Sequence, residues 1–201
     1  MGRAQFDRAG FVTAARALIV ERGPQAVTVD SVAERIGAPK GSFYYRFASR
    51  DALLGELWLE TVLAYQKGFV AAIEMGDGLG AALHSPAWAR RHLDDARLLM
   101  LYSRQDFVQG EWPAPLKRGV VDQAERFEGC LRAFARNAFE GVGPADMRRA
   151  TFVLAEVPVA AVKPHLMRRE RPPKLVDELI TKTYHAIVGA GTAPASRHSS
   201  A

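Results

Sequence analysis

The chain has 201 residues, of which 48% are hydrophobic and 24% are charged, and this balance is typical of globular proteins rather than disordered or fibrous ones. Its single cysteine, Cys130, excludes an intramolecular disulfide framework and favours a reducing compartment, so we expect the cytoplasm. The N-terminus has no apolar signal segment. The longest nearly apolar run, residues 150–162, is too short to span a membrane, so no membrane partner is expected.

The net charge of +5 is unevenly distributed along the chain. Residues 1–50 hold 8 Lys and Arg against 4 Asp and Glu, whereas residues 51–201 hold 19 against 18. The basic excess therefore lies almost wholly in the first quarter. Such asymmetry indicates an anionic partner for the N-terminal segment, and nucleic acid is the commonest one.

Three helices are predicted in the first quarter. Apolar residues recur at helical spacing over residues 11–22 and stop at a Gly-Pro pair, and the same pattern returns over residues 28–36, with Thr28 as N-cap. A third short helix, residues 40–47, is expected to begin after Pro39. Two short helices joined by a glycine-containing turn are typical of a helix-turn-helix motif.

The stretch over residues 40–47, KGSFYYRF, divides into two sets. Phe43 and Phe47 are four residues apart on one helical face, which predicts two core side chains. The remaining side chains point away from that face. In a recognition helix, Lys40 and Ser42 would reach base edges, Gly41 would allow close backbone approach, and Tyr44, Tyr45 and Arg46 would bind phosphates, with Arg50 extending that contact.

The rest of the chain is also predicted to be helical. Ser49 caps a long helix that runs to about residue 75, and further helices are expected at about 79–92, 94–108, 115–140, 144–163 and 173–188, with a kink at Pro158. No stretch shows the alternation of a strand. We therefore predict an all-α protein of about nine helices: a helix-turn-helix head (1–48), a helical body (49–188) and a disordered tail (189–201).

Residues 5–58 resemble the TetR family of bacterial transcriptional regulators. The resemblance rests on several fixed spacings: Ala14-Ala15, Glu21-Arg22-Gly23, Thr28, Val32-Ala33, Gly37, the run from Lys40 to Phe47, and Ser49 to Leu54. It implies that Thr28 binds phosphate, that Lys40, Gly41 and Ser42 face bases or nearby phosphates, and that Tyr44, Tyr45, Arg46 and Arg50 bind the DNA backbone.

Three positions depart from the family pattern. Arg46 stands where histidine is usual, so its charge should not depend on pH. Asp30 replaces an arginine that often contacts bases, and Pro39 replaces a serine. The last two changes predict that two DNA contacts of the family are lost.

For the body, the resemblance implies a homodimer formed through the last two long helices and a small-molecule effector between the middle ones. The residues that could line an effector pocket are Trp58, Tyr65, Trp88, Tyr102, Phe107 and Glu156, with Met100 and Trp112 as further aromatic or methionine candidates. Aromatic residues at helical spacing also suit an ordinary core. Glu156 is alone in an apolar run and would either pair with an arginine or bind a cationic ligand.

Enzymatic and metal chemistry find no support in the sequence. The five histidines lack ligand spacing, Cys130 lies among predicted core residues, and no phosphate loop or nucleophile motif occurs. No cofactor is expected. The basic run at residues 168–171 could contact DNA or lipid headgroups, or could be a solvated loop.

The sequence therefore predicts a non-enzymatic, DNA-binding transcriptional regulator. We expect a repressor that a small molecule releases from a near-palindromic double-stranded operator. A helical DNA-binding or protein-interaction module with an architectural role is the alternative. An enzyme acting on a small molecule in the helical body is the third hypothesis, with no residue constellation behind it.

Overall fold

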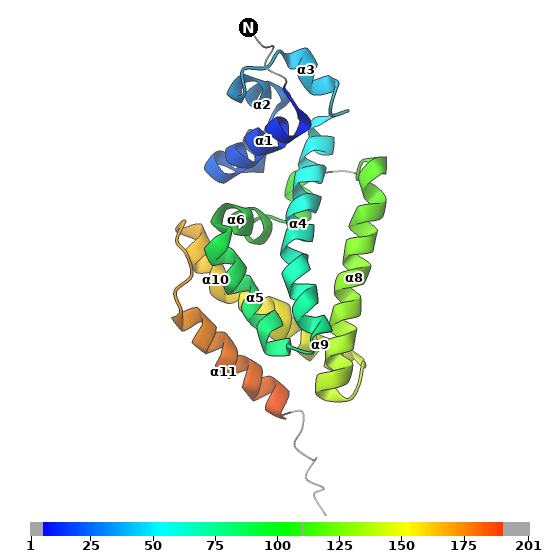
Figure 1. Cartoon of the computed structure of the whole chain (residues 1–201), viewed down its shortest axis with the longest axis vertical. Coiled ribbons are helices and arrows are strands. Elements are labelled where there is room, and N and C mark those ends of the chain that lie inside the picture. The colour runs from blue at the N-terminus through cyan, green and yellow to red at the C-terminus, as the bar shows by residue number, and fades with distance from the viewer. Residues whose placement is uncertain (1–5, 110, 191–201) are drawn as a thin grey trace, which may run out of the picture. The chain divides into compact units, whose positions relative to one another are not determined.

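The structure is a computed structural model that describes residues 6–109 and 111–190, and within these residues it is helical with no strand (Figure 1). The predicted all-α class is confirmed. The chain forms two compact units, one of residues 1–66 and 92–125 and the other of residues 67–91 and 126–201. The helices over residues 50–74 and 114–139 each contribute to both units. The predicted head boundary at residue 48 stays a prediction.

The first unit begins with the predicted head. Its helices are α1 (Arg8–Arg22), η1 (Pro24–Ala26), α2 (Val29–Arg35), α3 (Lys40–Tyr44), the start of α4 (Arg50–Glu74), α6 (Leu93–Leu101), α7 (Arg104–Phe107) and the start of α8 (Ala114–Phe139). The single helix predicted at 94–108 is wrong. Tyr102 is extended, and the Ser103 hydroxyl and amide both donate to Asp106, at 2.7 and 2.6 Å, which begins a separate helix.

Side-chain caps explain where the short helices of the head begin. Thr28 Oγ1 accepts from the Ser31 amide at 3.0 Å while Ser31 Oγ accepts from the Thr28 amide at 2.9 Å, so each satisfies a free N–H of α2. The Ser49 hydroxyl accepts from the Ala52 amide at 3.1 Å at the start of α4, as predicted. Helix α3 begins at Lys40, directly after Pro39, which is its N-cap, and it ends at Tyr44 rather than at residue 47.

The turn between α2 and α3 depends on a glycine. Gly37 has a φ of 66°, in the left-handed region that a side chain disfavours. There the Gly37 amide donates to the Glu34 carbonyl at 3.1 Å and the Ala38 amide donates to the Ala33 carbonyl at 2.9 Å. This pattern closes the C-terminus of α2 and turns the chain sharply into α3.

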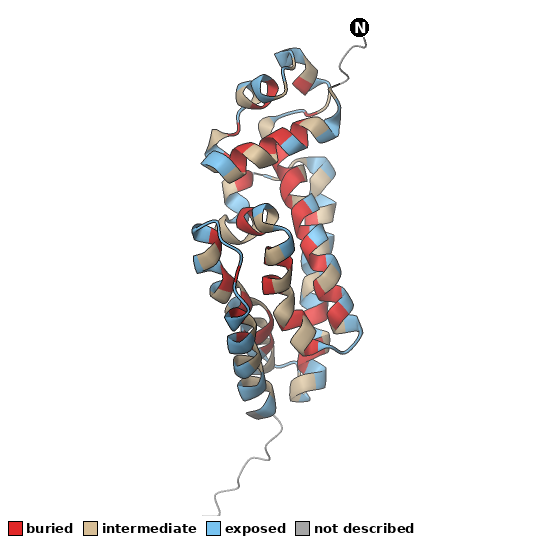
Figure 2. Ribbon diagram, turned by 60° about the vertical axis from the view of Figure 1, so that its left-hand side comes forward, coloured by how far each residue is buried: buried red, intermediate tan, exposed pale blue. Residues whose placement is uncertain are grey.

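Three phenylalanine rings form the centre of the head core, which Figure 2 shows as the buried inner faces of its helices. The Phe11 ring lies 5.7 Å from Phe43 and 6.3 Å from Phe47, in edge-to-face contacts. The Phe43 and Phe47 rings lie 5.6 Å apart. The predicted core role of Phe43 and Phe47 is confirmed, since both are fully buried.

The second unit contains the end of α4 and of α8, and five further helical segments among the described residues. These are α5 (Gly78–Arg91), α9 with η2 and α10 (Pro144–Thr151, Phe152–Glu156, Val157–Met167), and α11 (Leu175–Ala190). The predicted helix at 144–163 thus extends to Met167. The helix widens into a π-type segment over residues 152–156, and Pro158 follows close behind it. Proline has no N–H and cannot donate to the carbonyl four residues earlier, so the regular α-helical hydrogen-bond pattern is interrupted here.

The helix over residues 144–167 is unusually apolar and exposed. It is 24 residues long, with a mean hydropathy of 1.2 over its most apolar window, and 33% of that window is buried. By length and composition alone it could cross a membrane. Within the second unit, however, it packs against α5 and α11, so its remaining exposed face also suits contact with another protein chain. Residues 191–201, most of the predicted tail, lie outside the described residues.

Candidate nucleic-acid interface

Helix α3 has one buried face and one open face. Phe43 and Phe47 are buried in the head core, while the Tyr45 side chain is 89% exposed and Tyr44 is 56% exposed. The Tyr44 ring packs edge-on against Phe43, with the ring centres 5.5 Å apart. Tyr44, the last residue of α3, and Tyr45, its C-cap, are therefore exposed next to phenylalanines that are buried in the core.

The other predicted DNA-facing residues surround this helix. Thr28 and Gly41 are exposed, Ser42 is half-buried, and the Arg46 guanidinium donates to the Ser42 carbonyl at 3.3 Å. A side chain added at Gly41 would meet nothing within 4 Å, so the fold itself does not require glycine there. This absence of a side chain leaves the backbone of α3 open to close approach.

Arg50 differs from the other predicted DNA contacts. Its guanidinium donates to the Val27 carbonyl at 2.6 Å and to the Pro24 carbonyl at 2.8 Å, and it lies 3.1 Å from Asp51. These bonds tie the segment before α2 to the start of α4. Arg50 is therefore engaged inside the head, and a phosphate contact from it would have to share or replace these bonds.

Lys40 carries an ion pair that the sequence analysis missed. Its Nζ lies 2.7 Å from Asp30 Oδ1, with both side chains largely exposed. The hydrogen bond and the charge of Asp30 raise the pKa of Lys40 above its ordinary value. The two residues are ten positions apart on different helices, so local periodicity does not indicate the pair.

Arg8 is a second contact that the sequence analysis missed. It donates to the Arg46 backbone carbonyl, pairs with Glu56, and lies 4.2 Å from the centre of the Phe47 ring. The hydrogen bond with Glu56 raises the pKa of Arg8 above its ordinary value. Arg8 thus fixes the C-terminal end of α3 against α1 and α4.

The residues predicted for an effector pocket are divided between the two units. In the first unit, the Trp58 ring lies 5.3 Å from Trp112, and Phe107 is fully buried with Tyr102 6.5 Å away, as in a packed core. Tyr65 is buried on α4. In the second unit, Trp88 is buried on α5, and exposed Glu156 pairs with Arg148 at 2.6 Å, which is the salt-bridge alternative.

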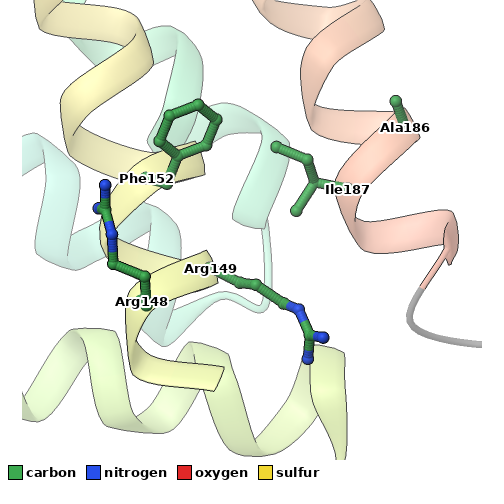
Figure 3. A pocket seen from close by; sticks show the side chains of 5 residues that line it. All are labelled: Arg148, Arg149, Phe152, Ala186 and Ile187. Atoms are coloured by element: carbon green, nitrogen blue, oxygen red, sulfur yellow. The ribbon is translucent and has the colours of Figure 1, made fainter. Parts of the chain in front are cut away.

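Two clefts lie in the second unit. One, of about 410 Å³, is lined by Arg148, Arg149, Phe152, Ala186 and Ile187 (Figure 3). The other, of about 210 Å³, is lined by Ile73, Gly76, Gly78, Phe134, Asn137, Ala138, Tyr184 and Val188, and burial raises the pKa of its Tyr184 phenol. None of the six predicted effector residues lines either cleft.

Metal ligands do not cluster in the part of the chain that the structure describes, where no group of three or more His, Cys, Asp or Glu side chains could hold an ion. Cys130 is buried, and that burial raises the pKa of its thiol above the ordinary value. A raised thiol pKa disfavours the reactive thiolate, which fits a packing role.

Comparisons with known proteins give two results: the head matches a protein-family model, and the whole fold is similar to solved structures. Residues 11–57 match the family model of the bacterial regulatory proteins of the tetR family. No curated protein matches the chain. Among solved structures, a putative tetR family transcription regulator from Shewanella sp. PV-4 is 14% identical, with a TM-score of 0.67 over 90% of this chain and 95% of that one.

Two further solved structures have the same fold. The ketosteroid transcriptional regulator KstR2 of Mycobacterium tuberculosis is 17% identical, with a TM-score of 0.60 over 94% of this chain and 96% of that one. The transcriptional regulator FadR from Bacillus subtilis, solved in complex with stearoyl-CoA, is 12% identical, with a TM-score of 0.61 over 90% of this chain and 98% of that one.

At these identities the solved structures establish the fold alone, and the family model matches the head of the chain. TetR-family regulators are DNA-binding transcription factors and not enzymes. Residues 11–57 are thus similar to the bacterial regulatory proteins of the tetR family, and the chain as a whole has the fold of solved TetR-family transcription regulators.

Proposed function

We propose that the protein is a homodimeric, cytoplasmic repressor that binds a near-palindromic operator and is released by a small-molecule effector. The observation that carries the proposal is the two-sided helix α3. Its phenylalanines are buried while its tyrosines are exposed beside Arg46 and Lys40. Phenol hydroxyls and cations on a short, well-fixed helix are suited to phosphates at the walls of a major groove.

In this proposal α3 enters the major groove. Lys40, Gly41 and Ser42, at the start of the helix, face bases or the nearest phosphates. Tyr44, Tyr45 and Arg46 bind the backbone of one strand, and Thr28, at the start of α2, binds the other side of the groove. Arg50 supports this interface by donating to the carbonyls of Pro24 and Val27. It could bind a phosphate only by sharing those N–H groups between the carbonyls and the phosphate.

Dimerisation is proposed through the helix over residues 144–167 and through α11. Apolar side chains remain exposed there: Phe152, Met167, Leu175 and Leu179. Leu175 and Leu179 are one helical turn apart on α11 and form an apolar stripe that a second copy of the chain would cover. A dimer would place two heads on half-sites about 34–36 Å apart, one turn of DNA.

The dimer proposal is tested with matched substitutions of two exposed leucines. Leu179→Glu should convert the dimer to a monomer in sedimentation velocity, because it buries an unpaired carboxylate in the interface. Leu63→Glu is the control, since Leu63 is 48% exposed on α4, outside the proposed interface. Equal oligomeric states for the two variants would contradict the assignment of α11.

Effector release is proposed by analogy with family members, of which one relative in the structural comparison was solved with stearoyl-CoA. The predicted pocket residues Trp58 and Trp88 are buried, and each belongs to a different unit. Binding of a ligand near either indole would change its fluorescence. The effector and DNA should weaken each other's binding by the same factor.

Binding to DNA upstream of the protein's own gene provides the main test. Fluorescence anisotropy should show salt-dependent, nanomolar-range binding to one or few sites. Replacing both Tyr45 and Arg46 by alanine should weaken binding at least about tenfold, because two backbone contacts are lost. The control is Arg118→Ala, which removes an exposed charge on α8.

The outcomes of this experiment separate a regulator from its alternatives. One or few genomic sites near transcription starts support a regulator. Many scattered sites of similar affinity would instead indicate an architectural DNA-binding protein. If wild-type protein shows no salt-dependent binding to any fragment, or if the double variant binds as well as wild type, the DNA-binding proposal is wrong.

A further inference from the structure

A carboxylate lies on the surface that the proposed function turns toward DNA. Asp30 is in the first turn of α2, and its Oδ1 lies 2.7 Å from Nζ of Lys40, the first residue of α3. The side chains are 70% and 58% exposed, so both have access to solvent or a ligand. A carboxylate in the first turn of α2 is favourable to the helix dipole, but phosphates would repel it at this place, so a second role in recognition is worth testing.

Stability of the turn does not account for the ion pair. An exposed ion pair contributes little to folding, because solvent screens it and both side chains lose freedom. The turn is already fixed by the amides of Gly37 and Ala38 and by the buried Phe43 ring. The Asp30 and Lys40 pair is therefore available for a role in recognition.

We propose that Asp30 and Lys40 act as one unit that reads a C·G base pair in each half-site. The Asp30 carboxylate accepts a hydrogen bond from cytosine N4, and the Lys40 ammonium donates to guanine O6 and N7. This inference rests on the proposed function, because it requires α3 to enter the major groove. It makes Asp30 a specificity-determining residue in place of the lost contact predicted from the sequence.

The hydrogen-bonding capacity of the pair selects this base pair. A carboxylate only accepts, so in the major groove it requires the amino group of cytosine or adenine. The ammonium uses one N–H on Asp30 and keeps two, and guanine offers two neighbouring acceptors for them. In an A·T pair the adenine N6 donor lies between two separate acceptors, adenine N7 and thymine O4, and the thymine methyl group lies beyond O4. One of the two remaining N–H groups of Lys40 would therefore have no acceptor.

The spacing within the pair agrees with this assignment. Asp30 Oδ1 and Lys40 Nζ form an acceptor and a donor 2.7 Å apart. Cytosine N4 and guanine O6 lie side by side in the paired bases as a donor and an acceptor. The Asp30 acceptor therefore faces the cytosine donor while the Lys40 donor faces the guanine acceptor, so the ion pair can bind the base pair without breaking.

Selection of bound sequences from a random DNA library tests the inference. Wild type should select a C·G pair at one position of each half-site, and any other pair there should lower affinity about tenfold or more. Asp30→Ala and Lys40→Met should each weaken the preference for the C·G pair at that position, because each removes one half of the unit that reads it. In either variant the penalty should fall below about threefold while the rest of the motif is unchanged.

The control is Glu34→Ala, which removes another exposed carboxylate from α2. It should strengthen binding to all sequences slightly and leave the motif intact. The inference is overturned if Asp30→Ala behaves like this control, or if the selected position is A·T. If wild type selects no sequence at all, the proposed DNA-binding function fails as well, so the two failures are distinguishable. Thermal unfolding of each variant should match wild type, because these side chains are exposed.

Discussion

Removing the Phe43 ring should destabilise the head without changing any residue on its outer surface. Phe43 is fully buried, and its ring contacts Phe11 at 5.7 Å and Phe47 at 5.6 Å. A five-residue helix cannot be stable alone, so α3 depends on these contacts. Phe43→Ala should therefore lower the free energy of unfolding of the head by about 3–5 kcal/mol, the usual cost of removing a buried phenylalanine.

The adjacent surface residue Tyr45 provides the matched control. Tyr45 is 89% exposed, so Tyr45→Ala should change the free energy of unfolding by less than about 0.5 kcal/mol. The same substitution should weaken DNA binding, since it removes a proposed phosphate contact. The two variants thus separate the stability of α3 from its function within one short stretch of sequence.

Hydrogen exchange followed by mass spectrometry measures the effect where it is expected. Peptides covering the head should exchange roughly 100- to 4,000-fold faster in Phe43→Ala, if exchange reports the equilibrium opening of the head. Peptides from α11, in the other unit, should be little affected. A loss of less than about 1 kcal/mol, or an equal loss in Tyr45→Ala, would refute the idea that the phenylalanine contacts hold α3 in place.

Three further outcomes follow from the structure. Gly78→Ala should lower the melting temperature and the free energy of unfolding by about 1–3 kcal/mol, because the new methyl group would collide with Tyr184 and Phe134. The control is Gly129→Ala on α8, where a methyl group would meet nothing within 4 Å, and it should raise the melting temperature slightly. Arg50→Ala should destabilise the head by about 1–3 kcal/mol in denaturant unfolding, because the Val27 and Pro24 carbonyls each lose a charged donor. Burial and then Glu56 raise the pKa of Glu60, against smaller opposing effects of Arg16 and Arg8, so the contribution of Glu60 to stability should fall as pH rises from the ordinary Glu value through the raised one. Glu60→Gln should lack this contribution, and pH–stability profiles of the same shape for wild type and Glu60→Gln would contradict it.

Local patterns in the sequence predicted the head well because its signals are local. The burial of Phe43 and Phe47 follows from their spacing, and the starts of α2 and α4 follow from capping residues whose partners lie three positions away. The left-handed Gly37 is likewise indicated by a glycine between two periodic segments. Features determined within one helical turn can be read from one helical turn of sequence.

Contacts between distant residues could not be predicted in this way. The Arg8 and Glu56 pair joins residues 48 positions apart, and the Arg50 bonds reach back 23 and 26 positions. Composition indicated a basic head but not which cations the head uses internally. The failed prediction of a single helix at 94–108 has a local cause, the cap formed by Ser103 and Asp106, which the apolar periodicity concealed.

The internal use of cations changes how the basic excess of the head should be interpreted. Within the described part of the first 50 residues, several cations pair with carboxylates of the chain: Arg8 with Glu56, Arg16 with Asp95, Arg35 with Glu21, and Lys40 with Asp30. Arg50 donates to backbone carbonyls as well. Most of the cations that indicated an anionic partner are thus engaged within the head. In the proposed complex with DNA, the neutral hydroxyls of Tyr44 and Tyr45 therefore contribute more to binding than the net charge of the head suggests.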